Sequence, residues 1–487
     1  MFIGRAGAGD RGGILPRQDF TSNPPKPGPC HGNGGEGRAR QTNRFEEVRR
    51  YVAGVDLAGH ADHYVCGPRK DDGTHDVESF GTTTAELLRM VAWMKARKVE
   101  SAAMESTSVY WIPVYDALES AGIEVVLVDT RTVRMVPGRK SDVKDCQWLQ
   151  RLHSCGLLRG AFRPPEAFNA VRSVIRERGN LLEMRTQVLQ ALQKSLDQMN
   201  VHVHHAVSDI DGATGMRILA AIVNGERDPQ ALAKLRDRRC KKSEAEIAEE
   251  LTGNWREEHL FNLGQSYRTL LFLDERIGEY DRQIRGMYAE IAKTFPPVDP
   301  PPGGGGRKPK DKEDAEAKAD LARICGGFDM TKLDGLGYDS AAAILAELGP
   351  DLSAFPTESH FVSYIGTAPA LGKSAGKNVS TRRNHKNTSR VGQILKMCAS
   401  TLFRSESSLG ARIRCVRSRT CSKTAVKDVA REMGKRIYRG LKHGQAYVDE
   451  GEAAYMNRTR ERTIRSMKKK ISKLGISAEE LGIRIAS

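Results

Sequence analysis

Hydrophobic and polar positions between residues 51 and 160 follow two alternating periods. Short apolar runs at 51–58 and 123–130 predict buried strands. The spacing of Leu87, Leu88, Val91 and Met94 predicts one amphipathic helix over 83–98. Further strands are expected at 61–67, 78–83 and 99–106, and a second helix at 110–122. Because strands and helices alternate, we expect residues 49–165 to form a layered α/β domain.

Beyond this region the pattern becomes helical. Residues 167–206 contain no proline and only Gly179, which favours one long helix or a coiled-coil arm. Its near-heptad apolar positions are Leu182, Val188, Leu189, Leu192 and Leu196. We therefore assign 166–293 to a helical, coiled-coil region. The Pro-, Gly- and Lys-rich stretch after it predicts a linker or insertion over 294–322.

The rest of the chain divides by composition. Residues 1–48 are poor in apolar residues and are expected to be a disordered extension. We expect a mostly α-helical domain at 323–450 and a basic helical tail at 451–487. Within 323–450, the stretch 333–349 contains glycines where a turn between two short helices would lie. It favours a helix-hairpin-helix-like element that presents backbone N–H groups to phosphate. A plain helical hairpin explains the same spacing.

The overall charge favours a polyanionic partner. The 487 residues carry 77 Lys and Arg against 61 Asp and Glu, a net charge of +16, which is typical of nucleic-acid-binding proteins, although a generic basic surface is the simpler explanation. Nine dispersed cysteines without a CxxC pair argue against zinc ribbons and indicate reduced, cytoplasmic thiols. No apolar run approaches the roughly 18 residues of a membrane span, and no secretory signal core is visible.

Four acids stand at positions that an α/β topology can bring together. Asp56 ends the first strand, Glu105 ends the strand at 99–106, and Asp142 and Asp145 open a helix after residue 140. Singly, each is explained as a turn acid or a helix cap. Together they form a set of hard oxygen ligands that suits Mg²⁺ or Mn²⁺, as in a ribonuclease-H-like, RuvC-like metal nuclease.

These motifs resemble those of a known family. The segments around Asp56, MEST at Glu105 and GRKSDVKDCQWL at Asp142 and Asp145 are similar to the DEDD signature of the insertion-sequence transposases numbered one-ten. The middle stretch 251–284 is similar to one branch of that family. LDGLGYDSAAAILAELGPDLSAF and the segment from Lys373 resemble its C-terminal serine transposase domain. The resemblance runs from about residue 51 to about residue 447.

The resemblance implies a chemistry that the composition does not. It places a nucleophilic serine at Ser374, in the stretch KSAGK, with Ser380 and Ser389 as weaker alternatives. Lys373, Lys377, Arg382 and Arg383 could hold the phosphate. It further implies a phosphoserine link to DNA, a noncoding bridge RNA as guide, and a dimer or tetramer that joins the metal domain of one subunit to the serine domain of another. Such a protein would be prokaryotic, cytoplasmic and nucleoid-associated.

Two other functions fit the same residues. A RuvC-like, metal-dependent junction nuclease would use the four acids without a covalent intermediate and without Ser374. An inactive nucleic-acid-binding relic would use neither. The presence of all four acids and the serine argues against the relic, and metal-dependent cleavage would exclude it.

Overall fold

The computed structural model describes residues 46–59, 61–106, 109–128, 142–298, 309, 311–368, 372–374, 377–379, 389–444 and 450–474, and the side chains of 142–144, 372–374 and 377–379 lie outside that description. The chain divides into two compact units, 1–161 and 162–487. The predicted disordered extension up to residue 45 lies outside the described residues.

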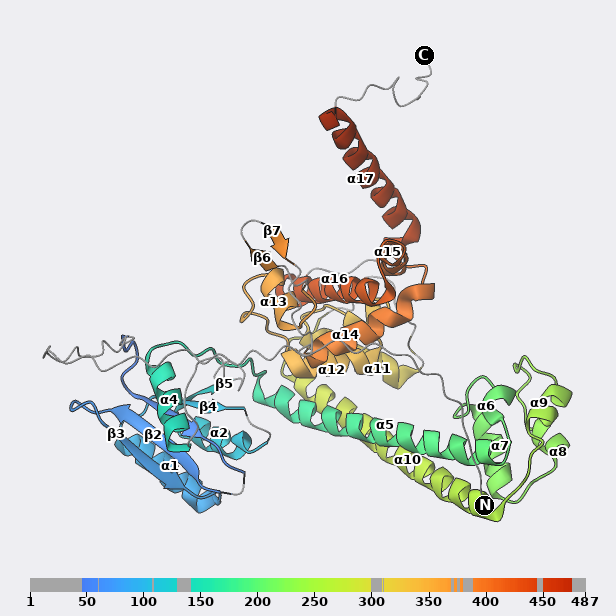
Figure 1. The fold of residues 1–487 in the computed structure, drawn as a ribbon, viewed down its shortest axis with the longest axis horizontal. Helices are drawn as coiled ribbons and strands as arrows, with labels where there is room; N and C mark the ends of the chain where they lie inside the picture. The colour runs from blue at the N-terminus through green and yellow to red at the C-terminus, as the bar shows by residue number, and fades with distance from the viewer. Residues whose placement is uncertain are drawn as a thin grey trace, which may run out of the picture. The chain divides into compact units, whose positions relative to one another are not determined.

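The first unit contains a five-stranded mixed sheet, as the alternating pattern predicts (Figure 1). Its strands are β1 (Val52–Asp56), β2 (His63–Arg69), β3 (His75–Phe80), β4 (Ser101–Glu105) and β5 (Glu124–Val128), in the order β3-β2-β1-β4-β5. β1, β2 and β3 are antiparallel neighbours, whereas β1, β4 and β5 are parallel.

The two faces of this sheet are covered by different helices. α1 (Thr84–Ala96) and α2 (Trp111–Ser120) share an apolar core with Val55 and Met104. Leu88, which the pattern predicts on the apolar face of α1, is exposed instead. The opposite face is covered by α4 (Asp142–Ser154), where Cys146 and Leu149 are buried. Successive side chains of a strand alternate between faces, so residues 52, 54 and 56 of β1 are directed toward α4.

The second unit is built on a long helical hairpin. α5 (Glu166–Gln198) lies antiparallel to α10 (Glu257–Lys293), and the arginines of α5 pair with aspartates of α10 at Arg178–Asp281 and Arg185–Asp274 (Figure 1). Leu192 and Leu196 are buried as the heptad pattern predicts, but Leu182 is exposed. The coiled-coil partner of α5 therefore comes from the same chain.

Short helices between these two form a lobe at one end of the hairpin. They are α6 (Val203–Ala206), α7 (Ala213–Val223), α8 (Pro229–Ala233) and α9 (Glu244–Glu250). They share one apolar core with the end of α5 and the start of α10. The lobe is therefore held to the hairpin by common apolar side chains.

The other end of the hairpin packs into a mostly helical C-terminal core. Its elements are α11 (Lys312–Ile324), the 3₁₀ helix η1 (Met330–Lys332), α12 (Tyr338–Leu348), α13 (Glu358–Tyr364), α14 (Arg390–Ser400), η2 (Thr401–Arg404), α15 (Ser408–Arg417) and α16 (Ser422–His443). Phe168 of α5 and Tyr288 of α10 belong to the same buried cluster, and the Tyr288 hydroxyl donates to the Ala342 carbonyl oxygen at 2.6 Å.

Two expectations for this region need correction. The stretch 294–322, predicted to be a linker or an insertion, is helical from Lys312 and so is not a linker throughout. An Asp311 cap and a run of Ala and charged residues favour α11 over an open chain. The stretch 333–349 contains one helix, α12, after a turn at Gly335, where φ is +81°, rather than a pair of helices. The preceding partner is only the three-residue η1.

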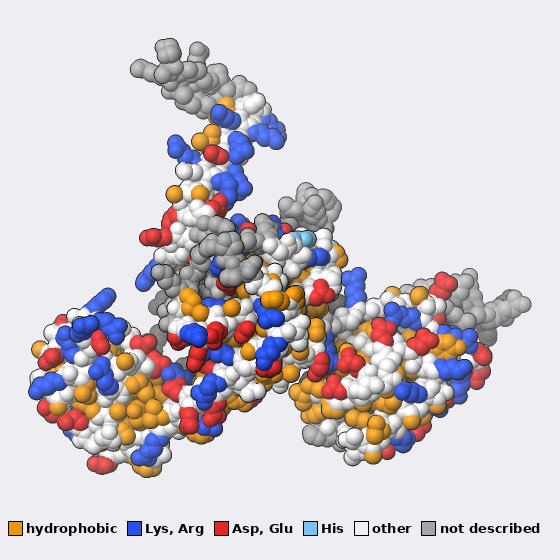
Figure 2. Space-filling model, turned by 180° about the vertical axis from the view of Figure 1, so that it is seen from behind, with side chains coloured by type: hydrophobic (Ala, Val, Ile, Leu, Met, Phe, Trp, Pro, Cys, Tyr) orange, Lys and Arg blue, Asp and Glu red, His pale blue; other side chains and the backbone are white. Residues whose placement is uncertain are grey.

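The C-terminal tail is helical, as predicted, from Gly451 to Leu474 (α17). It buries no residue, although it is attached to α15 through an ion pair between Arg414 and Glu452 at 2.6 Å. Lys and Arg side chains follow its length (Figure 2). Within the described residues, no helix has both the length and the apolarity that a membrane span needs.

Candidate catalytic site

Asp56 and Glu105 end two neighbouring parallel strands. Val55 of β1 is paired with Met104 of β4, so the two acids that follow leave the sheet at the same carboxyl edge. Since Val55 and Met104 face the core shared with α1 and α2, alternation directs Asp56 and Glu105 to the opposite face. Both carboxylates are therefore on the face that α4 covers.

The direction of α4 follows from the contacts of its last turn. The N–H of Val48, just before β1, donates to the Ser154 carbonyl oxygen at 2.8 Å. His153 Nε2 lies 2.8 Å from Ser101 Oγ at the start of β4. The helix therefore ends at the amino ends of the two strands, and its first turn, with Asp145, lies toward their carboxyl ends.

Gly54 allows this helix to lie directly on the sheet. A β-carbon at Gly54 would stand 2.2 Å from the Cys146 carbonyl oxygen and 2.3 Å from the Gln150 backbone nitrogen. Asp145 precedes the residue in that contact. The structure thus brings Asp56, Glu105 and Asp145 to one end of one face of the sheet.

Asp142 is the first residue of α4, one turn before Cys146, as the sequence predicts. Its backbone therefore lies at the same end of the helix as Asp145, and its side chain lies outside the described residues. Among the side chains that are described, three histidines form the one group close enough to share a metal ion, and Asp56, Glu105 and Asp145 do not form another. Like charges repel, which favours a separation between carboxylate oxygens wider than that of a shared metal site.

Buried polar groups fasten α4 in this position. Burial lowers the pKa of His153 to about 4, so the ring is neutral when it pairs with Ser101. Cys146 lies against Cys66 of β2, and the hydrogen bond between the two thiols, together with burial, raises the pKa of Cys66. Cys66 is therefore a packed thiol and not a thiolate nucleophile. Sequence reasoning missed these anchors, because each depends on a contact between distant segments.

Ser374 stands in a short hairpin of the second unit. β6 (Gly372–Ser374) pairs antiparallel with β7 (Lys377–Val379), with Ser374 opposite Lys377. The side chains of both strands lie outside the structural description. Residues 380–388, among them Ser380, Arg382 and Arg383, also lie outside the described residues. Ser389, the other alternative, caps α14 by accepting the Gly392 N–H at 3.2 Å. Its hydroxyl therefore has a structural use.

Comparison with known families adds independent evidence. Residues 53–201 match a family of transposases, the DEDD type of IS110, and residues 330–414 match the family described as transposase IS116/IS110/IS902. The chain belongs to the IS110 family of transposases. No curated protein matches it. The first match contains all four acids and the second contains Ser374.

Membership of the family establishes the class of reaction. This transposase is an enzyme that cleaves and recombines DNA, and the DEDD domain indicates dependence on a divalent metal. The donor set fits such an ion, because carboxylate oxygens from two strand ends and one helix are the hard ligands that Mg²⁺ and Mn²⁺ prefer. The matched DEDD domain contains all four acids, and three of them lie at this edge of the sheet.

Proposed function

We propose that this transposase cuts and rejoins DNA through a phosphoserine intermediate on Ser374, with the four acids as metal ligands. The observation that carries the metal site is the convergence of Asp56, Glu105 and Asp145 at one end of the α4-covered face. The strand order β3-β2-β1-β4-β5, with a parallel β1-β4-β5 half, supports a RuvC-like assignment of this domain.

In this proposal Asp56, Glu105, Asp142 and Asp145 hold Mg²⁺ or Mn²⁺. The bound cation would neutralise charge on a DNA phosphate and polarise its phosphorus–oxygen bonds. The protein positions the ligands of this cation. β1 and β4 hold two carboxylates at one edge of the sheet, and α4, which covers that face, contributes the other two. That arrangement orients a phosphate relative to fixed elements rather than to loops.

Ser374 supplies the nucleophile in the proposed reaction. Its Oγ forms a bond to the phosphorus of a DNA phosphodiester, and the bond from that phosphorus to one sugar oxygen breaks. The sugar oxygen leaves as a hydroxyl and takes up the proton that the serine loses. In the second half, a sugar hydroxyl of another strand attacks the phosphoserine, and Ser374 regains a proton. Phosphoester bonds are conserved, so no nucleotide cofactor is needed.

The partners beyond DNA are also part of the proposal. We expect a noncoding bridge RNA to pair with donor and target DNA, a homo-oligomer to assemble on them, and the protein to act in the prokaryotic cytoplasm at the nucleoid. The net charge of +16 and the exposed basic side chains of α17 support nucleic-acid binding (Figure 2). Lys373 and Lys377, beside Ser374 in the hairpin, would hold the attacked phosphate.

A covalent-adduct assay tests the serine chemistry. Purified protein, Mg²⁺, RNA transcribed from the flanking noncoding DNA, and labelled element-junction DNA are combined, denatured and separated. We expect a protein–DNA adduct that resists denaturation and is absent with Ser374→Ala. Asp56→Asn should also remove it, since the metal site acts before the adduct forms.

The same assay distinguishes the alternative. Free DNA ends without an adduct, formed equally by the wild type and by Ser374→Ala, would indicate a RuvC-like junction nuclease and would overturn the role of Ser374. Cleavage that persists in Asp56→Asn would overturn the metal site. Since the two variants change different units of the chain, the two failures can be told apart.

A further inference from the structure

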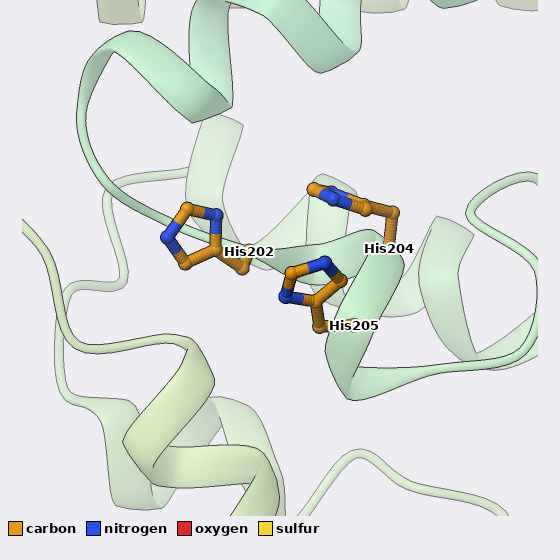
Figure 3. Close-up of side chains that lie close together, drawn as sticks. All are labelled: His202, His204 and His205. Carbon is orange, nitrogen blue, oxygen red and sulfur yellow. The ribbon is translucent and has the colours of Figure 1, made fainter.

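Three histidines gather at the tip of the helical hairpin, far along the chain from the acids. His202 immediately precedes α6, and His204 and His205 lie within it. Each offers one ring nitrogen, and these nitrogens all lie within 4.8 Å of one another (Figure 3). The ring centroids of His204 and His205 are only 4.2 Å apart. The cluster begins just after the family match to residues 53–201 ends.

The backbone that carries these rings is held firmly. Val201 and Val203 are fully buried in the lobe core, whereas the side chain of His202 between them is 33% exposed. The N–H of His202 donates to the Glu250 carbonyl oxygen at the end of α9, at 2.8 Å. A β-carbon on Gly253 would stand 2.5 Å from the Met199 carbonyl oxygen, so the two segments pack backbone to backbone. The cluster is therefore built on a rigid base.

Carboxylates surround the imidazoles. Asp197 Oδ1 lies 3.6 Å from His204 Nδ1 and 3.9 Å from His202 Nδ1. Both of these Nδ1 atoms are buried and form no hydrogen bond within the described part of the chain. Glu250 Oε2 lies 3.5 Å from His205 Nδ1. A buried, unpaired ring nitrogen costs free energy unless a proton donor or a cation satisfies it.

We infer that His202, His204 and His205 bind one Zn²⁺ ion or another late first-row divalent ion. Imidazole nitrogens suit zinc, nickel and copper rather than Mg²⁺. Asp197 would complete a tetrahedral set, because it lies close to both His202 and His204, and Glu250 would accept a hydrogen bond from His205 and orient its ring. Bonds of about 2.0–2.1 Å hold the nitrogens of a tetrahedral site roughly 3.4 Å apart, so small side-chain rotations close the cluster.

The ion would fasten the lobe rather than take part in DNA cleavage. It would link the end of α5 to α6, and through Glu250 to α9, in a lobe whose helices are short. An ion that binds only the folded state raises the melting temperature, and the rise grows with the logarithm of the free ion concentration once that exceeds the dissociation constant. The site is independent of Ser374 and of the DEDD acids, so it stands or falls separately from the proposed reaction.

The test uses the full chain without a histidine tag, stripped with a chelator. Zn²⁺ is titrated against a chromophoric chelator, and Co²⁺ is added in a second experiment as a spectroscopic probe. The variant is His204→Ala with His205→Ala. His360→Ala in α13 is the matched histidine control, and Asp56→Asn removes a ligand of the other metal site. Thermal unfolding is followed with and without Zn²⁺.

We expect one equivalent of Zn²⁺ that competes with the chelator, a higher melting temperature with Zn²⁺, and tetrahedral Co²⁺ bands without a sulfur-to-cobalt charge-transfer band. His360→Ala and Asp56→Asn should keep all three, and the double variant should lose them. If the double variant fails to fold, His205→Asn, at the most exposed ring, should weaken Zn²⁺ binding roughly ten-fold or more. Three results would overturn the site: Zn²⁺ binding in the double variant or in His205→Asn that equals the wild type, no Zn²⁺ binding that competes with the chelator, or a cysteine-to-cobalt charge-transfer band.

Discussion

The carbonyl oxygen of Cys146 lies 2.2 Å from the point where a β-carbon on Gly54 would stand. This contact sets the height of α4 above β1. Asp145 is the residue before Cys146, and Asp56 follows Gly54 by two positions on the same face of the strand. The absence of a β-carbon at Gly54 therefore determines how near the carboxylates of α4 come to those of the strands.

Gly54→Ala should damage both the fold and the reaction. The new methyl group would meet backbone atoms that cannot rotate away, so α4 must shift, at a cost of about 1–3 kcal/mol or more. We expect a lower melting temperature in tryptophan fluorescence and at least about ten-fold slower DNA cleavage. Gly179→Ala is the matched control, because nothing lies within 4 Å of its β-carbon position in α5, and it should not destabilise the chain. Wild-type stability and activity in Gly54→Ala would contradict this packing.

Removing one charge from the carboxylate edge should separate catalysis from stability. Asp56→Asn, Glu105→Gln and Asp145→Asn change charge with little change in volume. Each should reduce metal-dependent cleavage by on the order of a hundred-fold or more, since a metal ligand is lost.

Without metal, the same three substitutions should leave the melting temperature unchanged or raise it, because a like charge is removed from the cluster. Asp116→Asn, an exposed acid in α2, is the control for loss of charge in this unit. A stable variant with full activity would exclude that residue from the site.

The sequence predicts the elements well wherever a local period decides them. The strands at β1, β4 and β5 and the helices α1 and α2 stand where the hydrophobic pattern places them. The pairing of α5 with α10 is not visible locally, because the two are separated by the whole lobe. The helix α11 was missed because Pro- and Gly-rich residues before 312 dominate the composition of the window.

The candidate site shows the same division. Strand alternation and parallel pairing predict that Asp56 and Glu105 share an edge, and the structure confirms that placement. The approach of α4 depends on Gly54 and on the pairing of His153 with Ser101, which link segments far apart in sequence. Three histidines within four residues are visible in the sequence, but only the fold reveals that their ring nitrogens converge.

His153 should make the first unit sensitive to mild acid. Its pKa is about 4 in the folded protein, because of burial, against about 6.5 when unfolded. Between these values the unfolded chain binds a proton that the folded chain does not. This contribution to stability is therefore present above pH 6.5 and is lost as the pH falls toward 4, by about 2 kcal/mol at pH 5.

His153→Gln can keep a hydrogen bond to Ser101 without titrating. Urea unfolding at pH 7 and pH 5, followed through Trp93, Trp111 and Trp148, should show a smaller loss in the variant than in the wild type. Some loss should remain, since burial also lowers the pKa of His63. Identical pH dependence in the wild type and His153→Gln would show that His153 has the same pKa in the folded and the unfolded chain.

Ser389 and Ser374 should respond differently to substitution. Ser389 caps α14, so Ser389→Ala should cost about 1 kcal/mol of stability and still allow the covalent adduct. Ser389→Asp, which can also cap, should restore most of that stability. The adduct assay on stably folded variants decides between the serines. An adduct lost in Ser389→Asp and kept in Ser374→Ala would transfer the nucleophile's role to Ser389.

Exposed lysines on α17 should account for part of the salt dependence of nucleic-acid binding. Lys468, Lys469 and Lys470 are exposed and form no ion pair within the described residues, whereas Arg465 of the same helix pairs with Glu461. Each lysine that neutralises a phosphate releases a counterion, so replacing the three with glutamine should reduce the slope of log K against log salt by about 2–3.

The control for that prediction loses the same charge elsewhere in the chain. Lys95 in α1, Lys241 in the loop before α9 and Lys312 in α11 are exposed, and their replacement by glutamine also lowers the net charge by three. Binding of labelled RNA and of element-end DNA is measured over a range of salt concentrations. If α17 contacts the phosphate backbone, its variant changes the slope and the control changes it much less. Equal changes in both would mean that only the overall charge attracts nucleic acid and that α17 is a solvated helix without a specific contact.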